Sequence, residues 1–235
     1  MEVYVGTSGW VYDWNLGGSL DWYVKYSGLN AVELNMSFYR YPFKNQIIGW
    51  LRRGGKLRWA IKVHRSITHL FKLSDKALNP WFRFRELFKP MDNLIDFYLF
   101  QLPPSVKYSE RFLEKILKFH RESGLGSRFA IEFRDPSWFK NKRVLDTLSS
   151  AGVTLVSVDS PIGVWVVKSN DTIYLRMHGR YYWYAHYYTD EELIEVASKV
   201  MGLRPKRMYV FFNNNHDMLE NARRFYRLMR SLISK

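Results

Sequence analysis

The sequence predicts an α/β fold, a TIM-like (β/α)8 barrel with parallel strands and one shortened or irregular crossover after strand six. Eight short runs of β-forming apolar residues alternate with helical segments along the 235 residues. Eight is the number of strands that closes such a barrel. The runs also turn polar at their C-terminal ends, where the active sites of such barrels form. A doubly wound open sheet is the alternative.

The first half of the chain contains four predicted strands, at residues 2–9, 30–35, 58–64 and 96–104. An amphipathic stretch over 20–28 separates the first two. Pro42 is expected to begin the helix before the third, since proline suits a first helical turn. Two prolines stop the fourth strand, and residues 109–126 then show helical spacing and end in glycine.

The second half contains four more strands, at residues 128–136, 154–161, 172–179 and 206–215. Helices are predicted over 141–152, over 189–202 and from 217 to the C-terminus. Thr189 and Glu192 form the spacing of a capping box at the start of the second of these. The connection from Asp159 to Asp171 is too short for a helix, and residues 163–169 resemble an extra extended segment. No repeat or linker interrupts the chain, so residues 1–235 are predicted to form a single domain.

Composition excludes several classes of protein. With no cysteine there is no disulfide, zinc–thiolate site or cysteine nucleophile. No run approaches the roughly 20 apolar residues that cross a bilayer, and the N-terminus has no signal-peptide layout. A cytoplasmic protein without a membrane partner is expected.

The chain is strongly basic. Lys and Arg number 36 against 22 acidic residues, and residues 40–90 hold 13 of these basic residues against two acidic ones. Such a field attracts anions, and nucleic acid is the obvious large one. A charge-rich surface without a specific partner is the alternative. The expected partner is therefore an anionic small molecule or a nucleic acid, and the oligomeric state is left open.

Polar side chains recur at the end of every predicted strand. Several come in pairs two residues apart, so both members point to the same face. A buried network that satisfies itself would explain any single pair, but the recurrence at eight strand ends favours a site at the barrel mouth. The residues are Ser8, Glu33, Asn35, Lys62, His64, Gln101, Glu132, Arg134, Asp159, Arg176, His178, Asn213 and Asn214.

These residues suit acid–base chemistry on an anion. The predicted catalytic groups, which could exchange a proton once their surroundings tune them, are Glu33, Glu132, Asp159 and His178. The predicted substrate-binding groups are the basic Arg40, Lys62, His69, Arg134 and Arg176, the amides Asn35, Gln101, Asn213 and Asn214, and the aromatic Trp10, Tyr39 and Tyr182. Ion pairing of Arg134 and Arg176 with Glu132 and Asp159 across the barrel is the alternative.

The segment 179–188, GRYYWYAHYY, carries six aromatic residues directly after the seventh strand. Aromatic rings in a loop at the mouth would stack on a base or a sugar, although about half of them are expected to pack on neighbouring helices. No metal-ligand motif and no G-x-S-x-G sequence occurs. No cofactor and no metal-ligating residue are predicted, and a single divalent ion held by carboxylates is left open.

At these residues the sequence resembles the DUF72 family over nearly its whole length. The landmarks are VGTSGWVYDW, VELNMSFYRYP, IKVHRSITHL, FQLPPS, IEFRDPSWF, VDSP, YLRMHGR and FFNNN. The resemblance implies a TIM barrel, of a class similar to endonuclease IV and xylose isomerase, and implies no established activity. The chain departs from the family pattern in a short segment after Trp14 and in having His64.

Three functions follow as hypotheses. The first is an enzyme with hydrolase-like acid–base chemistry on a phosphate-bearing, ring-containing substrate, with nucleic acid as one form of it. The second is an enzyme of the sugar isomerase or glycosidase type, where paired carboxylates act on the ring. The third is a nucleic-acid-binding protein without turnover.

Overall fold

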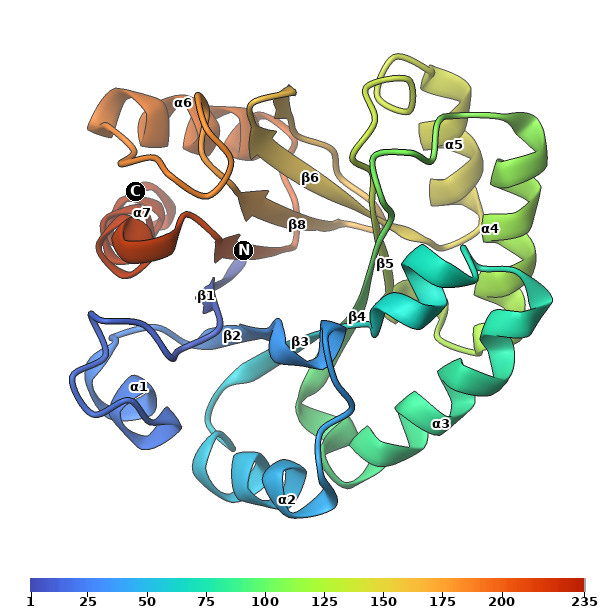
Figure 1. Cartoon of the computed structure of the whole chain (residues 1–235). Coiled ribbons are helices and arrows are strands. Elements are labelled where there is room, and N and C mark those ends of the chain that lie inside the picture. The colour runs from blue at the N-terminus through green and yellow to red at the C-terminus, as the bar shows by residue number, and fades with distance from the viewer. Residues whose placement is uncertain (235) are drawn as a thin grey trace.

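The computed structural model describes residues 1–234, in which eight parallel strands close into a barrel (Figure 1). Strand β1 pairs with β2 on one side and with β9 on the other, and pairing of β5 with β6 closes the ring. The predicted barrel is therefore confirmed, and an open sheet is excluded. The strands are β1 (Glu2–Ser8), β2 (Ala31–Leu34), β3 (Arg58–Lys62), β4 (Ile95–Gln101), β5 (Phe129–Glu132), β6 (Thr154–Ser160), β8 (Thr172–Met177) and β9 (Arg207–Phe212).

Helices surround the barrel as an outer ring (Figure 1). They are α1 (Leu20–Tyr26), α2 (Lys44–Arg53), α3 (Leu78–Phe88), α4 (Glu110–Ser123), α5 (Lys142–Ser150), α6 (Asp190–Gly202) and α7 (Met218–Ile233). Short 3₁₀ turns occur at Met36–Phe38, Asp75–Ala77, Lys89–Leu94, Gly126–Arg128 and Asn215–Asp217, with one π turn at Ser66–Leu70.

Local sequence signals set several helix ends. The capping box at α6 is present, because Thr189 Oγ1 accepts from the Glu192 amide and the Glu192 carboxylate accepts from the Thr189 amide. Helix α4 ends at Gly124, whose φ of 66° is the left-handed conformation that glycine adopts without strain. Helix α2 begins at Lys44, two residues after the expected Pro42.

The connection from β6 to β8 contains no helix, as predicted. Its extended segment is the short strand β7 (Gly163–Trp165), which pairs antiparallel with β6 and lies outside the eight-stranded ring. The crossover is therefore irregular at the predicted place.

Two apolar layers hold the barrel together. The larger layer lies between the strands and the helices, and a smaller one fills the interior. The interior layer consists of Ala31, Ala60, Phe97, Leu99, Ala130, Val156, Tyr174, Tyr209 and Phe211. Because side chains alternate along a strand, the next inward positions after Ala31, Ala60, Ala130 and Tyr174 are Glu33, Lys62, Glu132 and Arg176.

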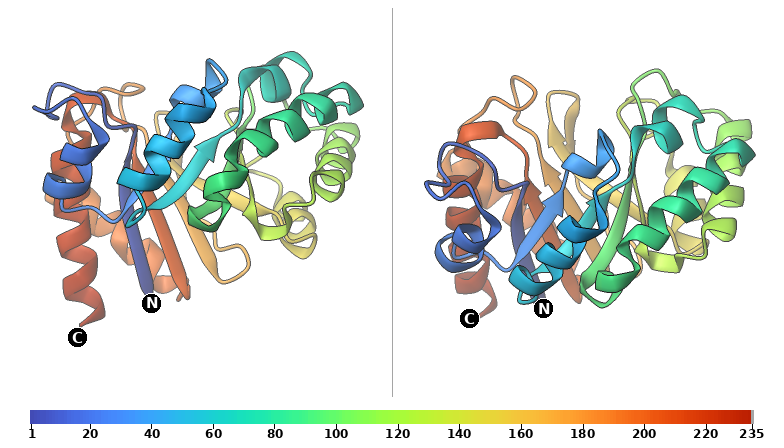
Figure 2. Two further views of the ribbon diagram at one scale, coloured as in Figure 1. Left: turned by 90° about the horizontal axis from the view of Figure 1, so that it is seen from below. Right: turned by 60° about the horizontal axis from the view of Figure 1, so that its bottom comes forward.

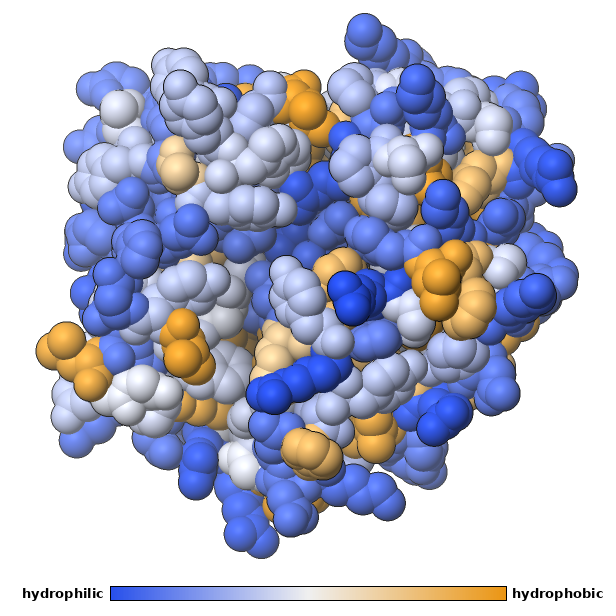
Figure 3. All heavy atoms as spheres, in the orientation of Figure 1, coloured by the Kyte–Doolittle hydropathy of each residue, from blue (hydrophilic) through white to orange (hydrophobic). Residues whose placement is uncertain are grey.

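Figure 1 looks onto the C-terminal ends of the strands, and Figure 2 shows both chain termini at the opposite end of the barrel. Hydrophilic side chains gather across the centre of the face that carries the strand ends (Figure 3). We call these strand ends and the loops that follow them the barrel mouth. None of the helices in residues 1–234 has the length and apolar composition needed to span a membrane.

Candidate active site at the barrel mouth

Arg176 on β8 is the centre of a buried ion-pair network. Its side chain is fully buried, and its Nε and Nη2 donate to the two Glu33 oxygens at 2.9 and 2.6 Å. Its Nη1 donates to Glu132 Oε2. Although burial disfavours the charge, the Glu132 and Glu33 carboxylates raise the pKa of Arg176 above its ordinary value. A permanently charged Arg176 therefore links β2, β5 and β8.

Glu33 on β2 is saturated with donors. Ser8 Oγ and the Tyr174 hydroxyl each donate to it at 2.6 Å, in addition to the two bonds from Arg176. Four donors from β1 and β8 thus hold one buried carboxylate in a single position. In this state Glu33 orients Arg176.

Glu132 on β5 is the second carboxylate of the network. Its Oε1 lies 2.6 Å from Arg134 Nε and 3.1 Å from His178 Nε2. Burial alone would raise its pKa, but the Arg134 and Arg176 guanidiniums hold the pKa of Glu132 well below its usual range. The carboxylate is therefore ionised at neutral pH and is a weak base.

His178 on the loop after β8 is neutral in this network. Burial, followed by the charge of Arg134, holds its pKa well below the usual range. Asn213 Nδ2 lies 3.3 Å from His178 Nδ1, and an amide donor there favours the tautomer with the proton on Nε2, directed at Glu132. Asn213 therefore orients the imidazole.

Arg134 is a nearly buried arginine whose terminal nitrogens make no short hydrogen bonds. Its Nε lies 2.6 Å from Glu132 Oε1 without the geometry of a hydrogen bond, and Nη1 and Nη2 make only long contacts of 3.4 Å with the Tyr184 hydroxyl and His178 Nε2. The guanidinium also lies 4.4 Å from the centre of the Trp183 ring. Two N–H groups beside an aromatic face suit an anion attached to a ring.

Lys62 on β3 is a buried amine without an acidic partner. Its side chain is 7 % exposed, and its Nζ lies 4.3 Å from the centre of the Phe38 ring. Within residues 1–234 its Nζ has no hydrogen-bond or ion-pair partner. Burial and the charge of Arg176 lower the pKa of Lys62 to about 7, and Arg134 contributes in the same direction.

Four other predicted binding residues lie at the mouth without joining the network. His69 packs edge-on against Phe38, and burial together with the charges of Lys62 and Arg134 lowers its pKa to about 4. Tyr39 is exposed, Asn35 Oδ1 is buried without a partner in the described part of the chain, and Gln101 donates to the Leu102 carbonyl. Of these, His69 lies close enough to Lys62 and Arg134 to sense their charge.

Asp159 lies apart from the network. It shares the outward face of β6 with Leu155, a residue of the outer core layer, and accepts from Tyr188 OH and Arg180 Nε at 3.0 and 3.1 Å. Burial raises its pKa. The structure therefore pairs Asp159 with Arg180 rather than with Arg134 or Arg176.

Four more predicted residues have other surroundings. Trp10 is buried against Trp50 and Trp59 on the outer side of the barrel. Asn214 donates to the His186 carbonyl and to Asn221 Oδ1, so it connects the aromatic loop 179–188 to α7. Arg40 and Tyr182 are both exposed at the surface.

The aromatic loop 179–188 is more exposed than expected, because Tyr188 alone of its six aromatic residues is buried and four are exposed. Trp183 and Tyr184 face Arg134 and His178, Tyr188 is fully buried, and Tyr181 and Tyr182 are each 74 % exposed. Tyr174, Trp183 and Tyr184 are site residues that the residue-by-residue prediction missed. The two-residue spacing of Tyr174 from Arg176 was the available signal.

No cluster of three or more His, Cys, Asp or Glu residues with metal-binding geometry occurs among residues 1–234. The Glu33 and Glu132 carboxylates are paired with arginines. The Asn213 amide lies against the His178 imidazole. The divalent ion left open by the sequence remains an open prediction.

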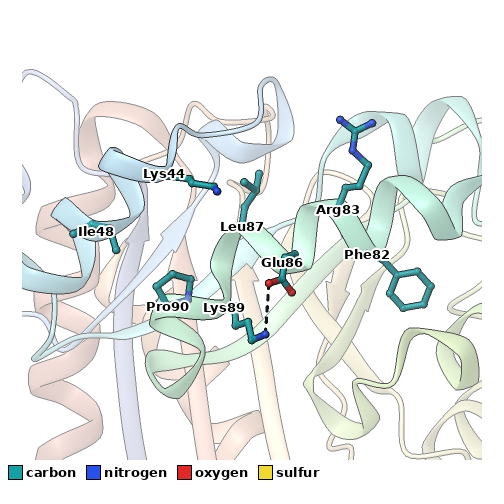
Figure 4. A pocket seen from close by; sticks show the side chains of 8 residues that line it. All are labelled: Lys44, Ile48, Phe82, Arg83, Glu86, Leu87, Lys89 and Pro90. Atoms are coloured by element: carbon teal, nitrogen blue, oxygen red, sulfur yellow. Dashed lines mark ion pairs between the residues drawn. The ribbon is translucent and has the colours of Figure 1, made fainter.

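A cavity of about 830 Å³ lies away from the mouth, between α2 and α3 (Figure 4). Lys44 and Ile48 of α2 face Phe82, Arg83 and Leu87 of α3 across it. Glu86 and Lys89, which also line it, form an ion pair at 3.5 Å. This cavity is part of the basic surface of residues 40–90.

Comparison with known proteins matches residues 4–234 to a family described as a protein of unknown function, DUF72. A solved DUF72 family protein from Thermotoga maritima is 28 % identical, covers 98 % of this chain and 100 % of its own, and superposes with a TM-score of 0.84. One from Enterococcus faecalis, at 20 % identity over 97 % of this chain and 95 % of its own, has a TM-score of 0.83 and shares the fold. No curated protein matches the chain.

Proposed function

The chain belongs to the DUF72 family, whose function is unknown, and we propose that it is an enzyme of the hydrolase type acting on a phosphate-bearing, ring-containing substrate at the barrel mouth. The observation that carries this proposal is Arg134, whose two terminal nitrogens make only 3.4 Å contacts while its Cζ lies 4.4 Å from the centre of the Trp183 ring. A phosphate on those nitrogens would place its ring beside Trp183 and Tyr184. Lys62 is a second cation for the same anion.

The surroundings of the titratable groups suggest how protons would move. Glu132 is ionised and His178 is neutral, and Arg134 contacts both. Lys62, with a pKa of about 7, is the group best suited to exchange a proton at neutral pH. The acid–base roles predicted for Glu33, Glu132, Asp159 and His178 remain predictions.

A second candidate is a nucleic-acid-binding protein without turnover. The observation that favours it is the cavity between α2 and α3, whose lining includes Lys44, Arg83 and Lys89 beside the half-exposed Phe82 (Figure 4). A nucleic-acid strand lying there would contact the outside of the barrel rather than its mouth.

Fluorescence anisotropy separates the two candidates. Labelled short single- and double-stranded DNA and RNA are titrated across a salt series, with nucleoside monophosphates as competitors. Wild type is compared with Arg134→Met, and Arg83→Met is the matched control on α3. Loss of hydrogen bonds to an ionic group, at about 1.5–3 kcal/mol, predicts at least about tenfold weaker binding for Arg134→Met and no change for Arg83→Met.

The reverse pattern would contradict an anion site at the mouth. Binding that Arg83→Met weakens, that Arg134→Met leaves intact and that disappears with salt would assign the nucleic acid to the outer surface.

A further inference from the structure

Lys62 is placed like a reactive amine. It is the one lysine among the buried polar residues of the described chain, and it points from the end of β3 into the mouth beside Arg134 and Arg176. We propose that Lys62 is a nucleophile that forms an imine with the carbonyl carbon of an anionic aldehyde or ketone. This inference rests on the proposed anion site, narrows its substrate class, and goes beyond hydrolysis as the reaction at that site.

The charges around Lys62 keep its amine available. Arg176 and Arg134 disfavour the ammonium form, and Glu132 and Glu33 favour it. Both carboxylates, however, already form ion pairs with those arginines at 2.5–2.6 Å. His69, the other titratable group nearby, has a pKa of about 4 and adds no charge at neutral pH.

The free amine is the form that attacks a carbonyl. With a pKa of about 7 against an ordinary 10.5, about half of Lys62 is unprotonated at pH 7, compared with roughly one in three thousand for an ordinary lysine. Lysines that are desolvated or lie beside another cation are the ones that enzymes use for imine chemistry.

The other lysines of the chain show what a structural role looks like. Lys118 forms an ion pair with Asp75 at 2.6 Å, and Lys199 forms one with Glu195 at 2.7 Å, both at the surface. Lys62 has no such partner. A lysine that only binds an anion acts through its positive charge, which arginine also carries, whereas imine formation requires the amine itself. The reactivity of Lys62 Nζ towards a carbonyl group therefore distinguishes imine formation from simple anion binding.

The step balances without an oxidant or reductant. The Lys62 Nζ lone pair forms a bond to the carbonyl carbon while the C=O π electrons move to oxygen, and one proton passes from Nζ to that oxygen. The hydroxyl of this carbinolamine then leaves with the second Nζ proton as water, and the nitrogen lone pair forms the C=N bond. The anionic group of the substrate would lie on the terminal nitrogens of Arg134. A sugar phosphate fits this class, because it is a ring when closed and a carbonyl compound when open.

Reductive trapping tests the inference on the full chain. The protein is incubated at pH 7 with pyridoxal 5′-phosphate or pyruvate plus sodium cyanoborohydride, and labelled lysines are mapped by mass spectrometry. Lys62 is expected to be labelled at least about tenfold faster than any other lysine. Pyridoxal without phosphate should react at least about tenfold more slowly, and inorganic phosphate should protect Lys62.

Variants make the outcome specific. Lys62→Arg keeps the charge and should abolish the rapid labelling, while the exposed-lysine control Lys44→Arg should not change it. Lys62→Met, which removes an unpaired buried charge, serves the same purpose if the arginine variant folds poorly.

The outcomes separate this inference from the proposed function. Binding of phosphate compounds that depends on Arg134, with Lys62 labelled no faster than surface lysines, would overturn the imine and leave the anion site standing. Neither binding nor labelling would overturn both.

Discussion

Replacing Arg176 with methionine tests the central network. The substitution keeps an unbranched side chain but removes the guanidinium and its charge from between Glu33 and Glu132, both of which are fully buried. Removing one partner of a buried ion pair leaves an uncompensated charge and costs about 3–5 kcal/mol. For a chain of this size such a loss lowers the thermal midpoint by on the order of 10 °C.

The pH dependence gives this prediction a second readout. In the wild type the pKa of Glu132 lies well below its unfolded value of 4.5, so its stabilisation is present above that value and is lost as the pH falls through the folded pKa. In Arg176→Met the two carboxylates repel each other, and a proton on one of them relieves the repulsion. The loss of stability should therefore be smaller at pH 5 than at pH 8.

Thermal and urea unfolding at both pH values, with Arg65→Met as an exposed control, measure these effects. Combining Arg176→Met with Glu33→Gln should restore part of the loss, because one buried charge remains and Arg134 pairs with it. A loss below about 1 kcal/mol, or an equal loss at pH 5 and pH 8, would refute the assignment of Arg176 as the balancing charge.

Three further predictions concern the neighbouring groups. Gly179→Ala should shift the aromatic loop and make it more sensitive to limited proteolysis. The φ of Gly179 is 99°, and a Cβ at this position would lie 2.7 Å from the Tyr182 carbonyl oxygen. A rate of cleavage equal to that of the wild type would contradict this prediction. Lys62→Met should be more stable than wild type by roughly 1–4 kcal/mol at pH 7 in urea unfolding, because burying the Lys62 ammonium costs stability. The folded pKa of about 7 lies below the unfolded value of 10.5, so this cost to the wild type disappears as the pH rises from about 7 to 10.5. A stability difference that stays constant up to pH 10.5 would be inconsistent with the lowered pKa. Asp159→Asn should destabilise the fold by about 1–3 kcal/mol, because it weakens the bonds to Arg180 and Tyr188. In a double-mutant cycle its effect should add to that of Glu132→Gln to within about 0.5 kcal/mol. Strong coupling between the two substitutions would contradict the separation of Asp159 from the network.

The fold could be predicted from the sequence because its signals are local. Alternating and continuous apolar runs mark the eight strands, and short patterns such as Thr189 with Glu192 mark helix ends. The missing helix between β6 and β8 follows from chain length alone. These features depend on neighbouring residues and need no knowledge of tertiary contacts.

The partners within the site could be predicted only in part. Strand alternation predicts that Glu33 and Arg176 both face inward, but not that they bind each other across 143 residues, because that depends on the stagger of the closed barrel. Asp159 is predicted at the mouth because it is a polar residue at the end of a strand, but every residue of β6 is buried, so the sequence there does not separate inward from outward positions. Trp10 is predicted there because it follows β1, but it packs outward on Trp50 and Trp59.

The most direct test of the account is the titration of Lys62 itself. Carbon-13 labelling of the lysine side chains, with Lys62→Arg to assign the signal, allows its pKa to be followed by NMR with and without inorganic phosphate. We expect a pKa of about 7 for Lys62 without phosphate and a rise of about one unit or more when phosphate binds beside Arg134. A pKa near 10.5 that phosphate does not change would contradict an unpaired buried cation at the mouth, and with it the anion site.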